Sequence, residues 1–104
     1  MHVHTNTDRN IQASESLAAQ VTAVVTRALR RFVDQVTRVE VHLSDENGIK
    51  SGADDKRCMM EARLDGRAPT AVTHRAATVE QAVDGAAGKL ARSIESSLAR
   101  EREY

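Results

Sequence analysis

The sequence predicts one α+β domain over residues 1–104, with the order β-α-β-β-β-α and two helices packed on one face of a four-stranded sheet. Two long segments carry apolar residues at three- and four-residue steps, which is typical of amphipathic helices. Four short segments alternate apolar and polar residues, which is typical of strands with one buried face. A chain of 104 residues is long enough for one such domain. Because the helices and the sheet each have one apolar side, the simplest packing lays both helices on the same face.

The first strand is expected at residues 2–7, where Val3 faces one side and His2 and His4 face the other. A turn at residues 6–10 follows. The first helix is expected to run from its N-cap candidate Ser14 to about Val33. Its apolar stripe comprises Leu17, Val21, Val24, Val25, Ala28, Leu29 and Phe32.

From Val36 the period becomes two, which predicts a strand that buries Val39, Val41 and Leu43 and exposes Arg38, Glu40 and His42. Residues 45–56 are polar and predict a connecting loop that holds Asp45, Glu46, Asp54 and Asp55. The next strand alternates between inward Cys58, Met60, Ala62 and Leu64 and outward Met59, Glu61 and Arg63. A turn at residues 65–67 leads to a fourth strand at about Thr70–Ala76, with Val72 and His74 on one face.

The segment Thr78-Val-Glu-Gln81 matches a capping box and predicts the start of the second helix, which is expected to end at about Ala99. Gly85 and Gly88 weaken a helix by about 1 kcal/mol each relative to alanine. They could also permit a close approach to the sheet. The buried stripe comprises Val79, Val83, Ala86, Leu90, Ile94 and Leu98.

Composition limits the classes of protein to which the chain can belong. Hydrophobic residues make up 40% of the chain, with Phe32 and Tyr104 as the aromatic residues, so the core must be aliphatic. Cys58 is the single cysteine, which excludes an intramolecular disulfide and favours a buried thiol in a reducing cytosol. No segment approaches the roughly 20 apolar residues of a membrane span, and the first residues do not resemble a signal peptide. We therefore expect a soluble, cytoplasmic protein that does not bind membranes.

The patterns that indicate catalysis or metal binding are weak. There is no glycine-rich phosphate loop, nucleophile elbow or pair of zinc-binding cysteines. His2, His4 and His42 could converge on zinc if the first two strands pair, although exposed strand histidines explain them as well. His74 reads as a partly buried histidine, and Asp54 with Asp55 as loop carboxylates. We expect no enzyme, no cofactor, no metal and no small-molecule substrate.

Two stretches carry a family resemblance. They are Arg38-Val-Glu-Val-His-Leu-Ser44 and Ala82-Val-Asp-Gly-Ala-Ala-Gly-Lys-Leu-Ala-Arg92. With the element order, they resemble the ribosome hibernation promoting factor and ribosome-associated inhibitor family, also known as sigma-factor modulation proteins. The resemblance covers roughly residues 2 to 100, and its most specific part is Ala82-Val83-Asp84 with Lys89-Leu90 and Arg92. At its length the chain resembles the short form of the family.

The resemblance implies binding to the small ribosomal subunit and its 16S-type rRNA near the decoding region, where the bound domain blocks translation sterically under stress. It implies no chemistry. The chain also departs from the family, because Glu80, Glu95, Glu101 and Glu103 dilute the positive charge of the second helix. A tyrosine that is common near the start of that helix is replaced by the sequence Val79-Glu80-Gln81.

The charge pattern offers partial physical support for an RNA surface. With 15 basic and 15 acidic residues the net charge is zero, but local fields decide where a polyanion docks. The candidate RNA-binding residues are Lys89, Arg92, Arg100, Arg27, Arg30, Arg31 and Arg75. Helix C-termini and solvated faces also attract arginines. The alternative is a protein-binding regulatory module of the same fold that no longer binds ribosomes. Either protein would be a monomer or a weak homodimer, since the sheet has open edges.

Overall fold

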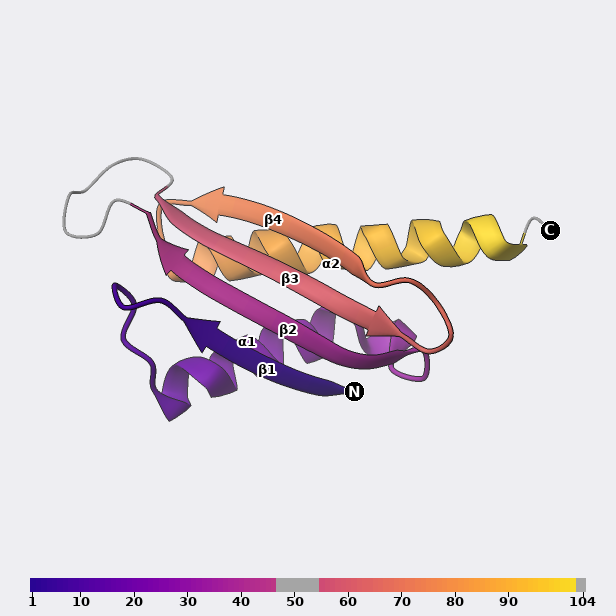
Figure 1. Cartoon of the computed structure of the whole chain (residues 1–104), viewed down its shortest axis with the longest axis horizontal. Coiled ribbons are helices and arrows are strands. Elements are labelled where there is room, and N and C mark those ends of the chain that lie inside the picture. Colours follow the sequence, from indigo (N-terminus) through magenta and orange to yellow (C-terminus); the bar gives the residue numbers. More distant parts are fainter. Residues whose placement is uncertain (47–54, 103–104) are drawn as a thin grey trace.

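The computed structural model describes residues 1–46 and 55–102. In order, these form β1 (His2–Thr7), α1 (Glu15–Ala28), the short 3₁₀ helix η1 (Arg30–Phe32), β2 (Val36–Asp45), β3 (Lys56–Leu64), β4 (Thr70–Ala76) and α2 (Val79–Arg102). Apart from the short η1, the predicted order β-α-β-β-β-α is confirmed (Figure 1).

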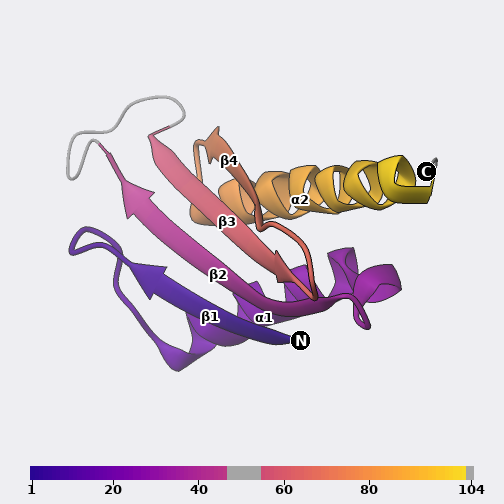
Figure 2. The same ribbon diagram turned by 45° about the vertical axis from the view of Figure 1, so that its right-hand side comes forward.

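The four strands form one sheet in the order β1-β2-β3-β4. β1 runs parallel to β2, which requires the crossover that α1 provides, and the other neighbours are antiparallel. Both helices lie behind the sheet in Figure 1 and on the same side of it in Figure 2, which confirms the predicted α+β packing. No described element covers the other face of the sheet.

The first helix begins as predicted and ends earlier. The hydroxyl of Ser14 accepts a hydrogen bond of 3.0 Å from the amide of Leu17, as expected of an N-cap. The predicted end at about Val33 is wrong, because α1 ends at Ala28. The amide of Phe32 bonds the carbonyl of Leu29, three residues back, which tightens the chain into η1. This turn buries Phe32 and leaves Val33 48% exposed, so the periodic stripe continues past the α-helix proper.

The second helix is longer than predicted. It begins where the hydroxyl of Thr78 accepts a hydrogen bond from the amide of Gln81, which confirms the threonine side of the capping box. It continues to Arg102, beyond the predicted end at about Ala99. Two tertiary contacts hold the last turns in place, since Leu98 is buried and Glu101 accepts a hydrogen bond from Arg67 in the turn after β3.

The core is aliphatic, as predicted. Its largest fully buried side chains include Leu29, Met60, Leu90 and Ile94. The inward residues predicted for the second and third strands are all buried. Cys58 is fully buried, which confirms the expected structural thiol. Burial raises the pKa of the Cys58 thiol to about 12, so it stays protonated at neutral pH.

One of the two helix glycines is required by the packing. A Cβ atom on Gly85 would lie 2.1 Å from Cδ2 of His74, so the half-buried ring of His74 occupies the space where a side chain would be. This confirms the expected close approach of α2 to the sheet at Gly85. At Gly88 the expectation is wrong, because an added Cβ would meet only Nη1 of Arg92, on the same helix, at 3.5 Å.

Two acidic residues of the predicted polar loop, Asp45 and Asp55, are buried. Asp45 is the last residue of β2 and pairs in register with Lys56, the first residue of β3. Nζ of Lys56 lies 2.9 Å from Oδ1 of Asp55 and 3.4 Å from Oδ2 of Asp45. Because the ammonium neutralises both carboxylates, β2 continues to Asp45 and β3 starts at Lys56, both within the range 45–56 that polarity predicts as a loop. Asp54 lies outside the described residues.

Candidate nucleic-acid interface

Three of the candidate RNA-binding residues lie at the end of the first helix. Arg27 is in the last turn of α1, and Arg30 and Arg31 are in η1. All three are exposed. The guanidinium of Arg31 lies 4.9 Å from the centre of the Phe32 ring and 3.0 Å from Oε2 of Glu95 on α2. This end of the molecule therefore presents two guanidinium groups without a carboxylate partner among the described residues and one that is paired.

Three more candidates lie on the second helix and are exposed. Nζ of Lys89 donates a hydrogen bond of 3.0 Å to the carbonyl of Thr73 on β4. The guanidinium of Arg100 donates to the hydroxyls of Ser96 and Ser97. Carbonyl and hydroxyl acceptors are neutral, so these contacts do not pair either side chain with a carboxylate. Arg92 has no ion-pair partner in the described part of the chain.

The seven candidates do not form one cluster. Arg31 contacts Glu95 on the flank of α2 that faces α1, whereas Lys89 reaches toward β4 on the opposite flank. Arg75 is on the outward face of β4, where Nη2 lies 2.9 Å from Oε1 of Glu46. Sequence spacing predicts which residues share one face of a helix. It does not predict which neighbouring helix or strand that face points toward.

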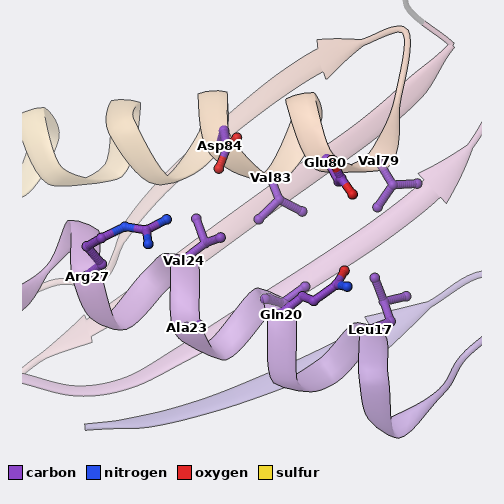
Figure 3. A pocket seen from close by; sticks show the side chains of 10 residues that line it. Leu17, Gln20, Ala23, Val24, Arg27, Val79, Glu80, Val83 and Asp84 are labelled. Carbon is purple, nitrogen blue, oxygen red and sulfur yellow. The ribbon is translucent and has the colours of Figure 1, made fainter.

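A groove between the two helices was not predicted. It has a volume of about 330 Å³ and runs between α1 and the first half of α2 (Figure 3). Its apolar lining comes from Leu17, Val21, Val24, Val79 and Val83. Arg27, Glu80 and Asp84 also line it. The apolar spacing had assigned Leu17, Val24 and Val79 to the core, because periodicity does not reveal how closely two helices approach.

On the outward face of the sheet, Glu40 is the centre of a hydrogen-bonded group. Nη2 of Arg38 donates to its carboxylate at 2.6 Å and Nδ1 of His4 donates at 3.0 Å, while the side chain of Asn6 donates at 3.4 Å. The hydrogen bond from Arg38, followed by that from His4, lowers the pKa of Glu40 from 4.5 to about 2.

The parallel register of β1 and β2 does not bring the three strand histidines together as a zinc site would require. His4 lies opposite Glu40, His2 opposite Arg38, and His42 opposite Asn6, so the imidazoles are spread over the face. Among residues 1–46 and 55–102, no group of three or more potential metal ligands is assembled.

Replacing Arg38 tests this account of Glu40. In the unmodified protein, the Glu40 carboxyl should titrate near pH 2 in a carbon-detected NMR experiment. In Arg38→Met the midpoint should rise by at least about one pH unit, because the largest cause of the shift is lost. Since the folded pKa lies below the unfolded value, Glu40 adds stability above about pH 4.5, and this contribution is lost as the pH falls toward 2. A Glu40 midpoint near 4.5 in both proteins would contradict the assignment.

Every arginine on the outward sheet face has a carboxylate nearby. Arg38 pairs with Glu40, and Nε of Arg63 lies 3.9 Å from Oε1 of Glu61. Arg57 and Arg75 are cross-strand neighbours that share Glu46, at 3.8 Å and 2.9 Å. The helix side differs, because five of its candidate cations have no carboxylate partner in the described residues. They are Arg27, Arg30, Lys89, Arg92 and Arg100.

The order of elements, the mixed sheet and the one-sided helix layer define the class of protein, which is a small α+β domain with two helices on one face. A scan against family models identifies the particular family. Residues 5–102 match the model described as "Sigma 54 modulation protein / S30EA ribosomal protein". The chain belongs to this family, whose members associate with ribosomes.

Solved structures show the same fold. The N-terminal domain of Thermus thermophilus Protein Y has a TM-score of 0.73 and 21% identity, over 92% of this chain and 98% of that chain. A ribosomal subunit interface protein from Coxiella burnetii has a TM-score of 0.68 and 14% identity, over 100% of both chains. A search of the curated proteins finds no match. Within the described residues, neither helix has the length and apolar composition needed to cross a membrane.

Proposed function

We propose that the chain binds the small ribosomal subunit through its 16S-type rRNA near the decoding region and blocks translation sterically under stress. Family membership supports ribosome association. The observation that carries the RNA contact is the difference between the two faces of the domain. On the sheet face every arginine is paired with a carboxylate, whereas the helix layer presents Arg27, Arg30, Lys89, Arg92 and Arg100 without one. The positive excess of this layer lies at the end of the first helix, where α1 and η1 carry three arginines and one glutamate, while α2 carries four basic and four acidic residues.

The geometry of the helix layer suits phosphate binding. A helix of 24 residues, such as α2, is about 36 Å long, which spans several successive phosphates of folded RNA. Arginine binds phosphate through a planar fork and lysine through a point charge, and neither requires a base sequence. Recognition of structured RNA depends mainly on shape and phosphate contacts. A rigid domain held in this way excludes messenger and transfer RNA by occupying their channel, and no covalent step is needed.

Co-sedimentation with purified small ribosomal subunits across a salt series tests the proposal. If five cations release counterions, the logarithm of the binding constant should fall linearly with the logarithm of salt concentration, with a slope of about −4. Chemical footprinting of the rRNA in the same complex should show protection near the decoding region. Absence of pelleting at low salt would contradict ribosome binding, and protection elsewhere would contradict the location.

The second candidate function is a protein-binding regulatory module. The apolar groove between α1 and α2 favours it, because such grooves are also used to bind partner helices. The negative side chains of Glu80 and Asp84 beside this groove would disfavour RNA there. The two functions differ in salt dependence, since a mostly apolar contact should change little over the same salt series.

A further inference from the structure

The outward face of the sheet carries its side chains in rows that cross the strands. The register aligns His2, Arg38 and Arg63 in the first row, His4, Glu40 and Glu61 in the second, Asn6, His42, Met59 and Thr73 in the third, and Ser44, Arg57 and Arg75 in the fourth. Glu46 follows beyond the fourth row and contacts Arg57 and Arg75. The face therefore alternates between basic, acidic, neutral, basic and acidic bands.

This arrangement is not the one that best stabilises a single sheet. Arg38 lies directly opposite Arg63, and Glu40 lies directly opposite Glu61. Like charges in directly opposed positions are unfavourable, and opposite charges there would be favourable. The chain compensates along each strand instead, through Arg38–Glu40 and the long Arg63–Glu61 pair of 3.9 Å. Within one copy of the chain, these like-charge pairs across the strands therefore lower the stability of the sheet.

The bands become complementary when the face meets a second copy of itself. Consider a twofold axis that lies between two such faces and runs across the strands along the third row. It places each strand antiparallel on the same strand of the other copy, so the second row of one copy faces the fourth row of the other. On β3, Glu61 then faces Arg57 of the second copy, and Met59 faces itself. On β2, Arg38 faces Glu46 of the second copy.

We propose that the outward sheet face is a self-association surface, on which a second copy of the chain packs face to face about this axis. Twofold symmetry makes each charged contact occur twice, which is the property of an isologous interface. Met59 supplies a flexible apolar contact at the centre. The intrachain pairs of Glu61 with Arg63 and of Arg57 with Glu46 are long, so Glu61 and Arg57 can exchange partners at little cost. Arg38 and Glu46 keep their short intrachain contacts with Glu40 and Arg75 and add the contact across the axis.

The size of the face predicts a weak dimer. Four strands about 4.8 Å apart and four rows about 6.8 Å apart give a flat area of roughly 500 Å² per copy, less than the ~800 Å² per partner of a standard interface. Association should therefore depend on concentration and weaken with salt. Both helices lie on the other side of the sheet, so the dimer leaves the helix layer exposed. Self-association and RNA binding thus use opposite faces of the domain.

Sedimentation velocity at about 50 mM salt tests the association. The weight-average mass should rise toward twice that of one chain between about 10 µM and 1 mM. Arg57→Glu should raise the dimer dissociation constant by about tenfold or more, because two attractive contacts become repulsive. The double variant R57E/E61R should restore affinity to within about threefold, since the swapped charges again oppose each other. Asp34→Arg, in the exposed turn before β2, should have no effect.

Cross-linking tests the axis itself. Sheets packed face to face lie about 10 Å apart, so two Met59→Cys copies should be joined by a bismaleimide with a spacer of about 8 Å. Arg63→Cys, two rows from the axis, should react at least about tenfold more slowly. The native thiol of Cys58 is buried and does not compete. Circular dichroism verifies that each variant is folded. A monomer at every concentration, a charge swap without recovery, or equal cross-linking at both positions would overturn the proposal.

Discussion

Reversing two charges on α2 should almost abolish binding of the protein to small ribosomal subunits. In Lys89→Glu/Arg92→Glu, the binding constant at about 100 mM salt should fall at least about 100-fold, because two phosphate contacts are lost and two repulsions are added. The slope of the logarithm of binding against the logarithm of salt should become shallower by about two. Both side chains are exposed and lack a carboxylate partner in the described residues, so the change should leave the fold intact.

The sheet face offers a matched control. Arg38→Glu/Arg63→Glu changes the net charge by the same amount on the face opposite the helices. If binding depends on the helix layer, this control should lower the affinity by less than about threefold at nanomolar protein, where self-association is negligible. Equal losses in the two variants would show that only total charge matters and would contradict the assigned surface.

A methyl group at Gly85 should destabilise the domain substantially. The Cβ of Gly85→Ala would lie 2.1 Å from Cδ2 and 2.6 Å from Cγ of His74, so the whole ring or the helix must move. Overpacking of this kind typically costs about 1–3 kcal/mol, which exceeds the roughly 1 kcal/mol that alanine gains over glycine in a helix. We expect a net loss of about 1 kcal/mol or more in the free energy of unfolding, measured by urea denaturation.

Two further variants separate steric conflict from helix propensity. Gly88→Ala makes the same chemical change where the added Cβ meets only Nη1 of Arg92 at 3.5 Å, so it should stabilise the domain by about 0.5–1 kcal/mol. In Gly85→Ala/His74→Ala the conflicting ring is absent, and the penalty of the Gly85 substitution should largely disappear when it is measured against His74→Ala. Similar effects at both glycines would exclude the close approach at His74.

The charge pairing explains how a chain with no net charge can present unpaired cations on its helix layer. Glu40, Glu46 and Glu61 pair with arginines of the sheet face, and Asp45 and Asp55 pair with the half-buried Lys56, whereas Glu80 and Asp84 of α2 have no ion-pair partner among the described residues. The helix layer has fewer such pairs. One exception is Arg31, which Glu95 holds at 3.0 Å, so this arginine should contribute less to RNA binding than Arg27 or Arg30. This distribution is a property of the folded chain and is absent from its composition.

Much of the fold follows from the sequence alone, because side-chain periodicity records which face of each element is buried. The alternation in the second and third strands, the Ser14 and Thr78 caps and the two helical stripes all predict the observed elements. The predictions that fail are those that depend on contacts between elements. The end of α1 at Ala28 reflects the need to bury Phe32, and the burial of Asp45 depends on an ammonium group from the next strand.

The candidate site shows the same division. The sequence determined by itself which cations lie on helices and that the chain resembles a ribosome-associated family. Only the tertiary structure decided that Lys89 and Arg31 lie on opposite flanks of α2, and that Arg75 is paired with Glu46. It also decided which charges face each other across the strands. The physical reason is that periodicity is a property of one element, whereas register, helix spacing and ion pairing depend on distances between elements that are far apart in the chain.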